Sequence, residues 1–357
     1  MATLTETAVV SRKAIKYGAI AFVAITLLWF IGGAAIRYYQ ALNPPAPPAP
    51  TMDFGLLPAI AFPKETGRPK LTLELPTGAI PEFPDRMKVF YAPTKRSGFL
   101  DADRAIETAR ALGFLFQPDQ PTETKYIWTN QDQLSSRLNM DIVSGHFKLT
   151  RVWQANPALL ALSSFTSDRQ VITDINNYLR KGGLLGGDID QEQKATYLAA
   201  VGGQLTPTIS LSEADFVQID FFRNNYEEIE AETKKVLASY PFYRPEPDYG
   251  LVRAIVSGSR DQADKIIGLD YNYTSVDYAK MGTYPIKTGE VAWQEFSNGG
   301  GLVTDKGPKT GNITIRRILL GYYDSPSQSY AMPIYLFLGD RGFVGYVSAV
   351  SDSVIRK

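Results

Sequence analysis

The chain contains no cysteine and only one histidine, His146, among its 357 residues. The lack of cysteine excludes a disulfide framework, a thiolate nucleophile and a zinc site built on cysteine. One imidazole excludes a multi-histidine metal site or a catalytic triad unless carboxylates supply every other group. His146 lies beside the Ser144-Gly145 turn, so we interpret it as a surface or turn histidine. A single catalytic histidine is the alternative.

The chain also lacks an excess of either charge, with 37 Lys and Arg against 37 Asp and Glu. A zero net charge without a basic stripe gives no electrostatic footprint for nucleic acid. The hydrophobic content of 44% is sufficient for a large core. We therefore expect a folded protein that does not bind nucleic acid.

Charges and prolines are absent from one N-terminal stretch, Tyr17 to Ile36. Twenty apolar residues in a helix span about 30 Å, the thickness of the hydrocarbon core of a bilayer. Basic residues are concentrated before the stretch, which predicts a cytoplasmic tail at 1–16, a transmembrane helix at 17–37 and an extracytoplasmic remainder in the cell membrane. The alternative is a cleaved signal peptide, with Gly32 to Ala35 as the candidate cleavage site.

A linker is predicted at 38–60, because five of the seven residues from Pro44 to Pro50 are proline. Such a composition favours an extended polyproline II spacer. The remainder divides into a first module at 61–164 and a second module at 165–357.

Three amphipathic helices are expected, each with an N-terminal capping residue and a glycine at its end. They are Leu100 to Phe114, capped by Asp101, then Ser167 to Gly182, and Thr288 to Asn298. The expected strands are Lys125 to Thr129, Leu138 to Val143, Phe147 to Trp153, Phe216 to Phe222, Leu251 to Ser257, Lys265 to Tyr273, Ile313 to Tyr323, Pro333 to Leu338 and Phe343 to Val350. Ala195 to Leu211 is either a hairpin turning at Gly202-Gly203 or a helix that stops there.

A helix followed by about three antiparallel strands thus occurs near both ends of the folded region. This pattern predicts the α+β class, with antiparallel sheets carrying helices on one face. It also suggests a degenerate duplication of one helix-plus-three-strand unit.

The first of these units resembles the helix-plus-hairpin plan of PepSY-like modules. The resemblance lies in Leu100-Asp101, Ala105 and Leu112-Gly113-Phe114, followed by Leu138 to Asp141 and Ser144 to Phe147. The resemblance implies a fold and supplies no catalytic residue.

The C-terminal part resembles the C-terminal half of YycH/YycI-type proteins. It does so in Tyr284-Pro285-Ile286, Ala292-Trp293, Leu320 to Tyr323, Pro333-Ile334-Tyr335 and Val347 to Val350. Those proteins are single-pass, extracytoplasmic accessory regulators of a bacterial sensor kinase. The resemblance therefore implies regulation through a protein partner in the membrane.

Acidic residues and glycines offer the remaining candidates for chemistry. Carboxylate pairs occur at Asp101/Asp103, Asp188/Asp190/Glu192 and Asp270/Asp277. The Gly186 to Glu192 stretch resembles a fragment of a calcium loop but lacks its central glycine and terminal glutamate, so a polar turn is the simpler interpretation. Asn298 to Gly301 ends a helix and lacks the lysine of a phosphate loop. We therefore expect no catalytic residue, cofactor or metal.

Aromatic residues are numerous, and four tyrosines, Tyr322, Tyr323, Tyr330 and Tyr335, cluster near the C-terminus. They are the candidate surface for a partner or ligand. Aromatic packing across strands is the alternative.

Three functions remain open. The first is a membrane-anchored, non-enzymatic binding or regulatory protein that contacts another envelope protein through a sheet surface or an exposed strand edge. The second is a structural or assembly component of the envelope, and the third is an envelope hydrolase that uses carboxylates.

Overall fold

The computed structural model describes residues 4–42, 49–65, 67–130, 135–156, 158–161, 165–190, 193, 195–230, 232–259 and 265–356. The chain divides into two compact units, and the division lies between Ala49 and Pro50. The proline-rich linker is outside the described residues from Pro44 to Pro48.

The N-terminal unit consists of one helix, α1 (Leu4–Leu42). It contains an apolar stretch, Ile15–Tyr39, with a mean hydropathy of 2.3 and exposed side chains. This stretch is about 37 Å long at 1.5 Å per residue, enough to cross a bilayer. The predicted apolar helix is confirmed, whereas its orientation stays a prediction. The predicted tail is not a separate segment, because its residues from Leu4 onward belong to the same helix.

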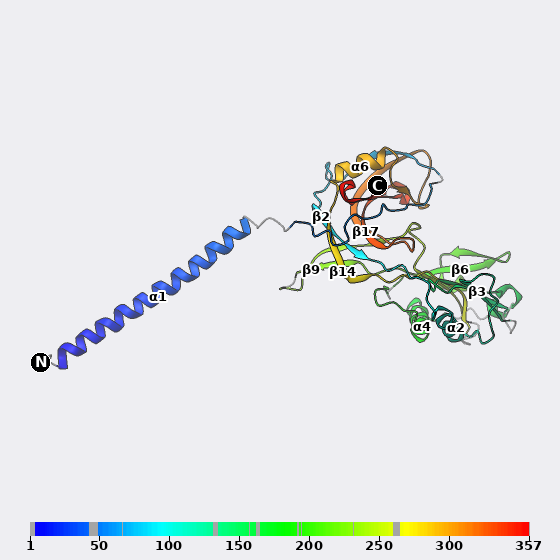
Figure 1. Ribbon diagram of the computed structural model, residues 1–357, viewed down its shortest axis with the longest axis horizontal. Coiled ribbons are helices and arrows are strands. Elements are labelled where there is room, and N and C mark those ends of the chain that lie inside the picture. The colour runs from blue at the N-terminus through cyan, green and yellow to red at the C-terminus, as the bar shows by residue number, and fades with distance from the viewer. Residues whose placement is uncertain are drawn as a thin grey trace. The chain divides into compact units, whose positions relative to one another are not determined.

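The first large sheet is antiparallel throughout, in the order β3-β4-β5-β13-β12-β8-β6-β7. Its strands are β3 (Lys125–Asn130), β4 (Ser136–Asp141), β5 (Phe147–Arg151), β6 (Ala195–Val201), β7 (Gln204–Thr208), β8 (Phe216–Phe221), β12 (Val252–Ser257) and β13 (Ile266–Tyr271). Two helices, α2 (Asp101–Ala111) and α4 (Asp168–Lys181), bury Ala109 and Leu179 against one face of it. Figure 1 shows both helices on the same side of β3 and β6.

The opposite face of this sheet carries a smaller apolar cluster. Because side chains alternate between faces along a strand, Phe216 of β8 points away from Val217 and packs with Trp153 and Leu159. Leu159 belongs to the short helix α3 (Ala158–Ala161), and Trp153 begins the 3₁₀ helix η1 (Trp153–Ala155). Polar side chains occupy much of the rest of this face.

The second large sheet follows the path β1-β16-β17-β18-β15, with β11 beside β16 and β2 between β17 and β14. Its strands are β1 (Lys70–Leu73), β2 (Arg86–Tyr91), β11 (Phe242–Tyr243), β14 (Asp277–Pro285), β15 (Leu302–Val303), β16 (Asn312–Tyr323), β17 (Tyr330–Gly339) and β18 (Val344–Ser348). The helix α6 (Gly289–Ser297) stacks Phe296 on Phe337 of β17 at 4.5 Å between ring centroids. Short 3₁₀ helices complete the unit: η2 (Leu211–Glu213), η3 (Asp340–Gly342) and η4 (Asp352–Val354).

These elements confirm the α+β class and the largely antiparallel pairing. The ambiguous stretch after Ala195 forms the β6–β7 hairpin, with its turn at Gly202-Gly203. Both sheets contain strands from either side of residue 164, so the two predicted modules do not correspond to the two sheets. The duplication stays a prediction.

One predicted cap differs from the structure. Ser167 and Thr288 cap their helices as expected, each accepting a backbone N–H. Asp101, by contrast, is the first residue of α2 rather than its cap, because its carboxylate accepts the N–H of Gly98 at 2.7 Å and pairs with Arg104.

The contact between α6 and β18 depends on a glycine. A Cβ added at Gly345 would lie 2.1 Å from a ring carbon of Phe296. We expect Gly345→Ala to lower the free energy of unfolding by about 1–3 kcal/mol, because the core must move to accept one methyl group. Urea unfolding followed by tryptophan fluorescence measures this change. Gly187→Ala is the control, since an added Cβ there meets no atom within 4 Å; equal losses for the two variants would contradict the prediction.

Candidate functional site

A buried arginine, Arg223, joins the two sheets. It lies two residues after the end of β8 in the first sheet, and its side chain is 0% exposed. Its Nε donates to Asp324 Oδ2 at 2.9 Å, and Asp324 follows β16 of the second sheet. Its Nη1 pairs with Asp188, and its Nη2 donates to the carbonyl of Thr274 at 2.7 Å. Three segments far apart in sequence therefore meet at one guanidinium.

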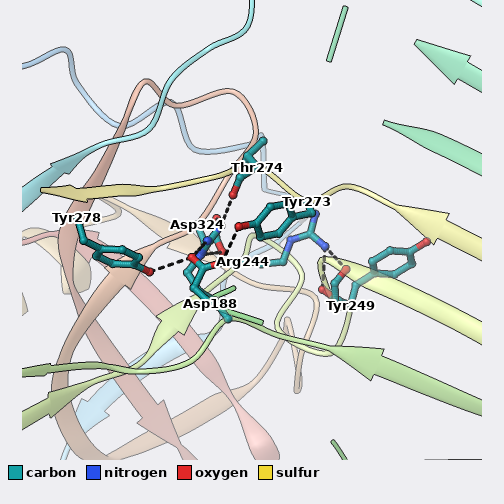
Figure 2. A network of polar contacts seen from close by, with 9 residues as sticks. Asp188, Arg244, Tyr249, Tyr273, Thr274, Tyr278 and Asp324 are labelled. Atoms are coloured by element: carbon teal, nitrogen blue, oxygen red, sulfur yellow. Dashed lines mark hydrogen bonds and ion pairs between the residues drawn. The ribbon is translucent and has the colours of Figure 1, made fainter. Parts of the chain in front are cut away.

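Two phenols complete this junction, which Figure 2 shows around Asp188 and Asp324. Tyr273 donates to Asp188 Oδ1 at 2.6 Å, and Tyr278 donates to Oδ2 at 3.1 Å. Burial raises the pKa of both phenols, and the charge of Asp188 raises it further. Both hydroxyls therefore stay protonated and act as donors.

Burial alone would lower the pKa of Arg223, but the carboxylates of Asp324 and Asp188 outweigh it and hold that pKa above its ordinary value. The guanidinium also lies 5.4 Å from the ring centroids of Phe242 and Tyr273. Paired charges, a carbonyl and aromatic faces thus satisfy a cation that burial would otherwise destabilise. The junction is a structural centre, because its charged groups are engaged with one another.

A cavity of about 670 Å³ lies beside this junction. Thr274 lines it directly, and Asp324 precedes the lining residues Pro326 and Gln328. The two chain segments that Arg223 contacts, 274–275 and 324–328, therefore form part of its wall. The remaining wall comes from the start of α2, the β4–β5 turn, the end of α4 and the segment before α2.

His146 lies in the wall of this cavity, directly after the β4–β5 turn. Its side chain is half-buried, and its Nε2 is buried with no hydrogen-bond partner. Burial lowers its pKa; a hydrogen bond to the backbone of Tyr273 and the charge of Asp141 oppose that shift, while Lys95 and Arg244 add to it. The imidazole is therefore neutral at pH 7.

The carboxylates predicted as pairs are placed in different environments. Asp101 lines the cavity but is held by Arg104, and the N–H of Gly98 keeps its pKa below the ordinary value. Asp188 belongs to the arginine junction, and Glu192 lies outside the described residues. Asp270 accepts the hydroxyl of Tyr249 on the first sheet. Among the described residues no group of three His, Cys, Asp or Glu side chains is arranged to hold a metal ion.

The candidate tyrosine surface is corrected at three of its four positions. Tyr322, Tyr323 and Tyr335 are 0%, 1% and 0% exposed, respectively, because they point into the apolar clusters of the second sheet. Tyr335 donates to the carbonyl of Lys287 inside this core. Tyr330 is half-buried and contacts Phe54, so its role as a contact residue stays a prediction.

A hairpin outside the two large sheets was not anticipated from the sequence. It consists of β9 (Tyr226–Ile229) and β10 (Val236–Tyr240), which pair only with each other among the described strands. At its base, Tyr226 and Tyr240 pack edge to face on the buried Tyr322 at 5.9 Å and 6.2 Å. Figure 1 shows β9 beside β14.

The outer part of this hairpin exposes apolar side chains among charged ones such as Glu227, Lys234 and Lys235. Ile229, Val236 and Leu237 are 52%, 44% and 63% exposed. The sequence of β9, Tyr-Glu-Glu-Ile, does not alternate apolar and polar residues, which is why periodicity did not predict this strand.

Comparison with protein-family models, curated proteins and solved structures finds no match to this chain. The resemblance to YycH/YycI-type proteins therefore stays a prediction.

The first prediction from this site concerns the arginine junction. Arg223→Met should lower the free energy of unfolding by about 3–5 kcal/mol, because two buried carboxylates lose their counter-charge. Combining it with Asp324→Asn should recover part of the loss, which denaturant unfolding of each variant measures. Arg316→Met is the matched control, since that arginine is 44% exposed and its ion pairs contribute about 0–1 kcal/mol. An Arg223→Met loss no larger than the control would refute the role of the junction.

The second prediction concerns the pH dependence of stability. The pKa of His146 in the folded protein lies below the ordinary value of 6.5, so the unfolded chain binds more protons below about pH 6.5. The contribution of the neutral imidazole to the free energy of unfolding is therefore fully present above that pH. It is lost as the pH falls through the pKa that His146 has in the folded protein. We expect His146→Gln to lose less stability than the wild type between pH 7.5 and 5. Identical pH profiles of the unfolding midpoint would rule this out.

Proposed function

We propose that this chain is a single-pass, membrane-anchored, extracytoplasmic binding or regulatory protein that is not an enzyme. It acts by contact with another envelope protein in the same membrane. The observation that carries the proposal is the β9–β10 hairpin, which combines unpaired strand edges with exposed apolar side chains. The apolar helix α1 supports the membrane anchor.

The backbone of the hairpin favours this role. A two-stranded hairpin is marginally stable alone, and here its base is fixed by Tyr226 and Tyr240 on the core. Its outer edges leave N–H and C=O groups available to another strand. An added strand would also cover Ile229 and Leu237.

The edges of the first sheet are protected, which distinguishes the hairpin from them. The edge strand β7 contains Pro207, which has no N–H to donate. At the other edge, Asp119 exchanges two backbone hydrogen bonds with Ile127 of β3. Edge protection prevents indiscriminate strand addition. The hairpin carries charged side chains, but β9 and β10 pair only with each other among the described strands, so its outer backbone edges are the favoured point of contact.

The membrane anchor would favour this contact by raising the effective concentration of the two proteins. Confining two partners to one membrane raises their effective concentration, so a small contact surface suffices for specific association. Because the C-terminal part resembles accessory regulators of a sensor kinase, we propose a membrane-bound sensor kinase as the partner. Of the two carboxylates that line the cavity, Asp101 and Asp141, the first is paired with Arg104 and held ionised, which disfavours it as the general acid of a carboxylate hydrolase.

In-cell photocrosslinking tests the proposed contact. A photoreactive residue at Leu237 should capture one membrane protein reproducibly, because the side chain is exposed at the hairpin. The same residue at Glu107, exposed on α2, is the matched control and should not capture it. Capture is read by mass spectrometry after membrane solubilisation.

The double variant Ile229→Lys, Leu237→Lys provides the second readout. Both positions are exposed, so the variant should fold normally and reach the membrane. The crosslink from a photoreactive residue at Val236, which is 44% exposed on the same hairpin, should be lost in this variant. Identical capture from Leu237 and Glu107 would contradict the proposal. Capture of a stoichiometric structural envelope component, or of a second copy alone, would favour the assembly function instead.

A further inference from the structure

The cavity beside the arginine junction has the size of a small-molecule site. Its volume of about 670 Å³ lies within the range of roughly 300–1,000 Å³ common for ligand pockets. Residues of the first sheet, of α2 and of loops next to the second sheet line it. The question is which chemistry its unpaired groups would recognise.

One polar atom in its wall lacks a hydrogen-bond partner. Nε2 of His146 is buried and unpartnered within the described part of the chain. Gln328 also lines the cavity and is only 7% exposed. Buried polar groups are nearly always satisfied in folded proteins, so the unpaired imidazole nitrogen indicates a missing partner.

Two opposite charges in the same cavity are also uncompensated. Lys95 makes no ion pair with any residue that the structure describes, and its Nζ lies close to Gly145. Asp141 has no cationic partner there either, since its Oδ1 accepts only the N–H and hydroxyl of Ser144. Arg104 and Asp101 neutralise each other and add no net charge.

Both charged side chains line the same cavity as the unpaired imidazole of His146. Lys95 and Asp141 both act electrostatically on His146, with opposite sign. A purely anionic ligand would meet Lys95 but be repelled by Asp141, and a cationic ligand would have the reverse difficulty. A ligand with both charges satisfies both groups.

We propose that this cavity binds a zwitterion of the size of a free amino acid or a dipeptide. The ligand carboxylate pairs with Lys95, its ammonium pairs with Asp141, and its polar body supplies a partner for His146. This site is separate from the β9–β10 hairpin and does not depend on the proposed protein contact.

Thermal unfolding of the full-length protein in detergent micelles tests the proposal. The probes are the twenty common L-amino acids and the twenty L-alanyl dipeptides, each added separately. A ligand at ten times its dissociation constant should raise the unfolding midpoint by roughly 2–4 °C. Calorimetric titration then gives the dissociation constant of the best probe and distinguishes the amino acid from the dipeptide.

Charge-blocked probes and variants assign the contacts. The methyl ester and the N-acetyl form of the best probe should each bind at least about tenfold more weakly, corresponding to the loss of one ion pair. Lys95→Met should weaken the parent probe to the same extent and leave no further loss for the methyl ester. Lys148→Met is the matched control, because Lys148 is exposed on the opposite face of the first sheet.

Lys95 is exposed, so Lys95→Met should unfold at the wild-type midpoint when no ligand is present. Weaker binding by this variant can then be assigned to the lost contact with the ligand and not to a loss of folding. A midpoint that no member of the panel shifts would overturn the proposal. Equal weakening by Lys95→Met and Lys148→Met, or equal binding of the parent and both blocked probes, would overturn it as well.

Discussion

A buried guanidinium must be paired, and this requirement organises the folded unit. Arg223 is fully buried where the first sheet ends, and a cation in that position is tolerated only with opposite charges and acceptors around it. Asp188, Asp324 and the carbonyl of Thr274 supply them. Because these partners come from separate segments, satisfying one side chain fixes the two sheets against each other.

The cavity and the hairpin both depend on this arrangement. Arg223 holds the Thr274 segment and the loop after Asp324, which are two parts of the cavity wall. The hairpin begins three residues after Arg223, and its Tyr226 packs on Tyr322 just before Asp324. A rigid junction thus sets both the shape of the cavity and the base of the protruding hairpin, which keeps each preorganised for binding.

Local signals in the sequence predicted much of the fold. The apolar stretch from Tyr17, the caps at Ser167 and Thr288, and the glycine turns identified elements whose stability is decided within a few residues. Periodicity identified most strands of the first sheet and β16 to β18 of the second for the same reason, whereas it missed β1, β2, β9, β10, β11, β14 and β15. Asp101 was the exception, since a nearby arginine and a backbone N–H competed for the carboxylate that would have capped the helix.

Contacts between residues far apart in the sequence could not be predicted from local patterns. Arg223 and Asp324 are 101 residues apart, and no local pattern indicates that they pair. The β5–β13 pairing crosses the predicted module boundary for the same reason. The buried tyrosines could not be placed from the sequence either. An aromatic cluster has the same composition in a ligand-binding surface as in a buried core, and only the tertiary fold determines which of the two it forms.

Hydrogen–deuterium exchange of the full-length protein with and without Arg223→Met tests the central role of the junction most directly. In Arg223→Met we expect the backbone amides of Asn224, Asp324 and Gln328 to lose their protection from exchange together. The amides of the β16–β18 core and of α6 should keep their protection. Such a result would show that one guanidinium holds separate segments in place. Unchanged protection at these three amides, or a uniform loss across the whole folded unit, would contradict the account.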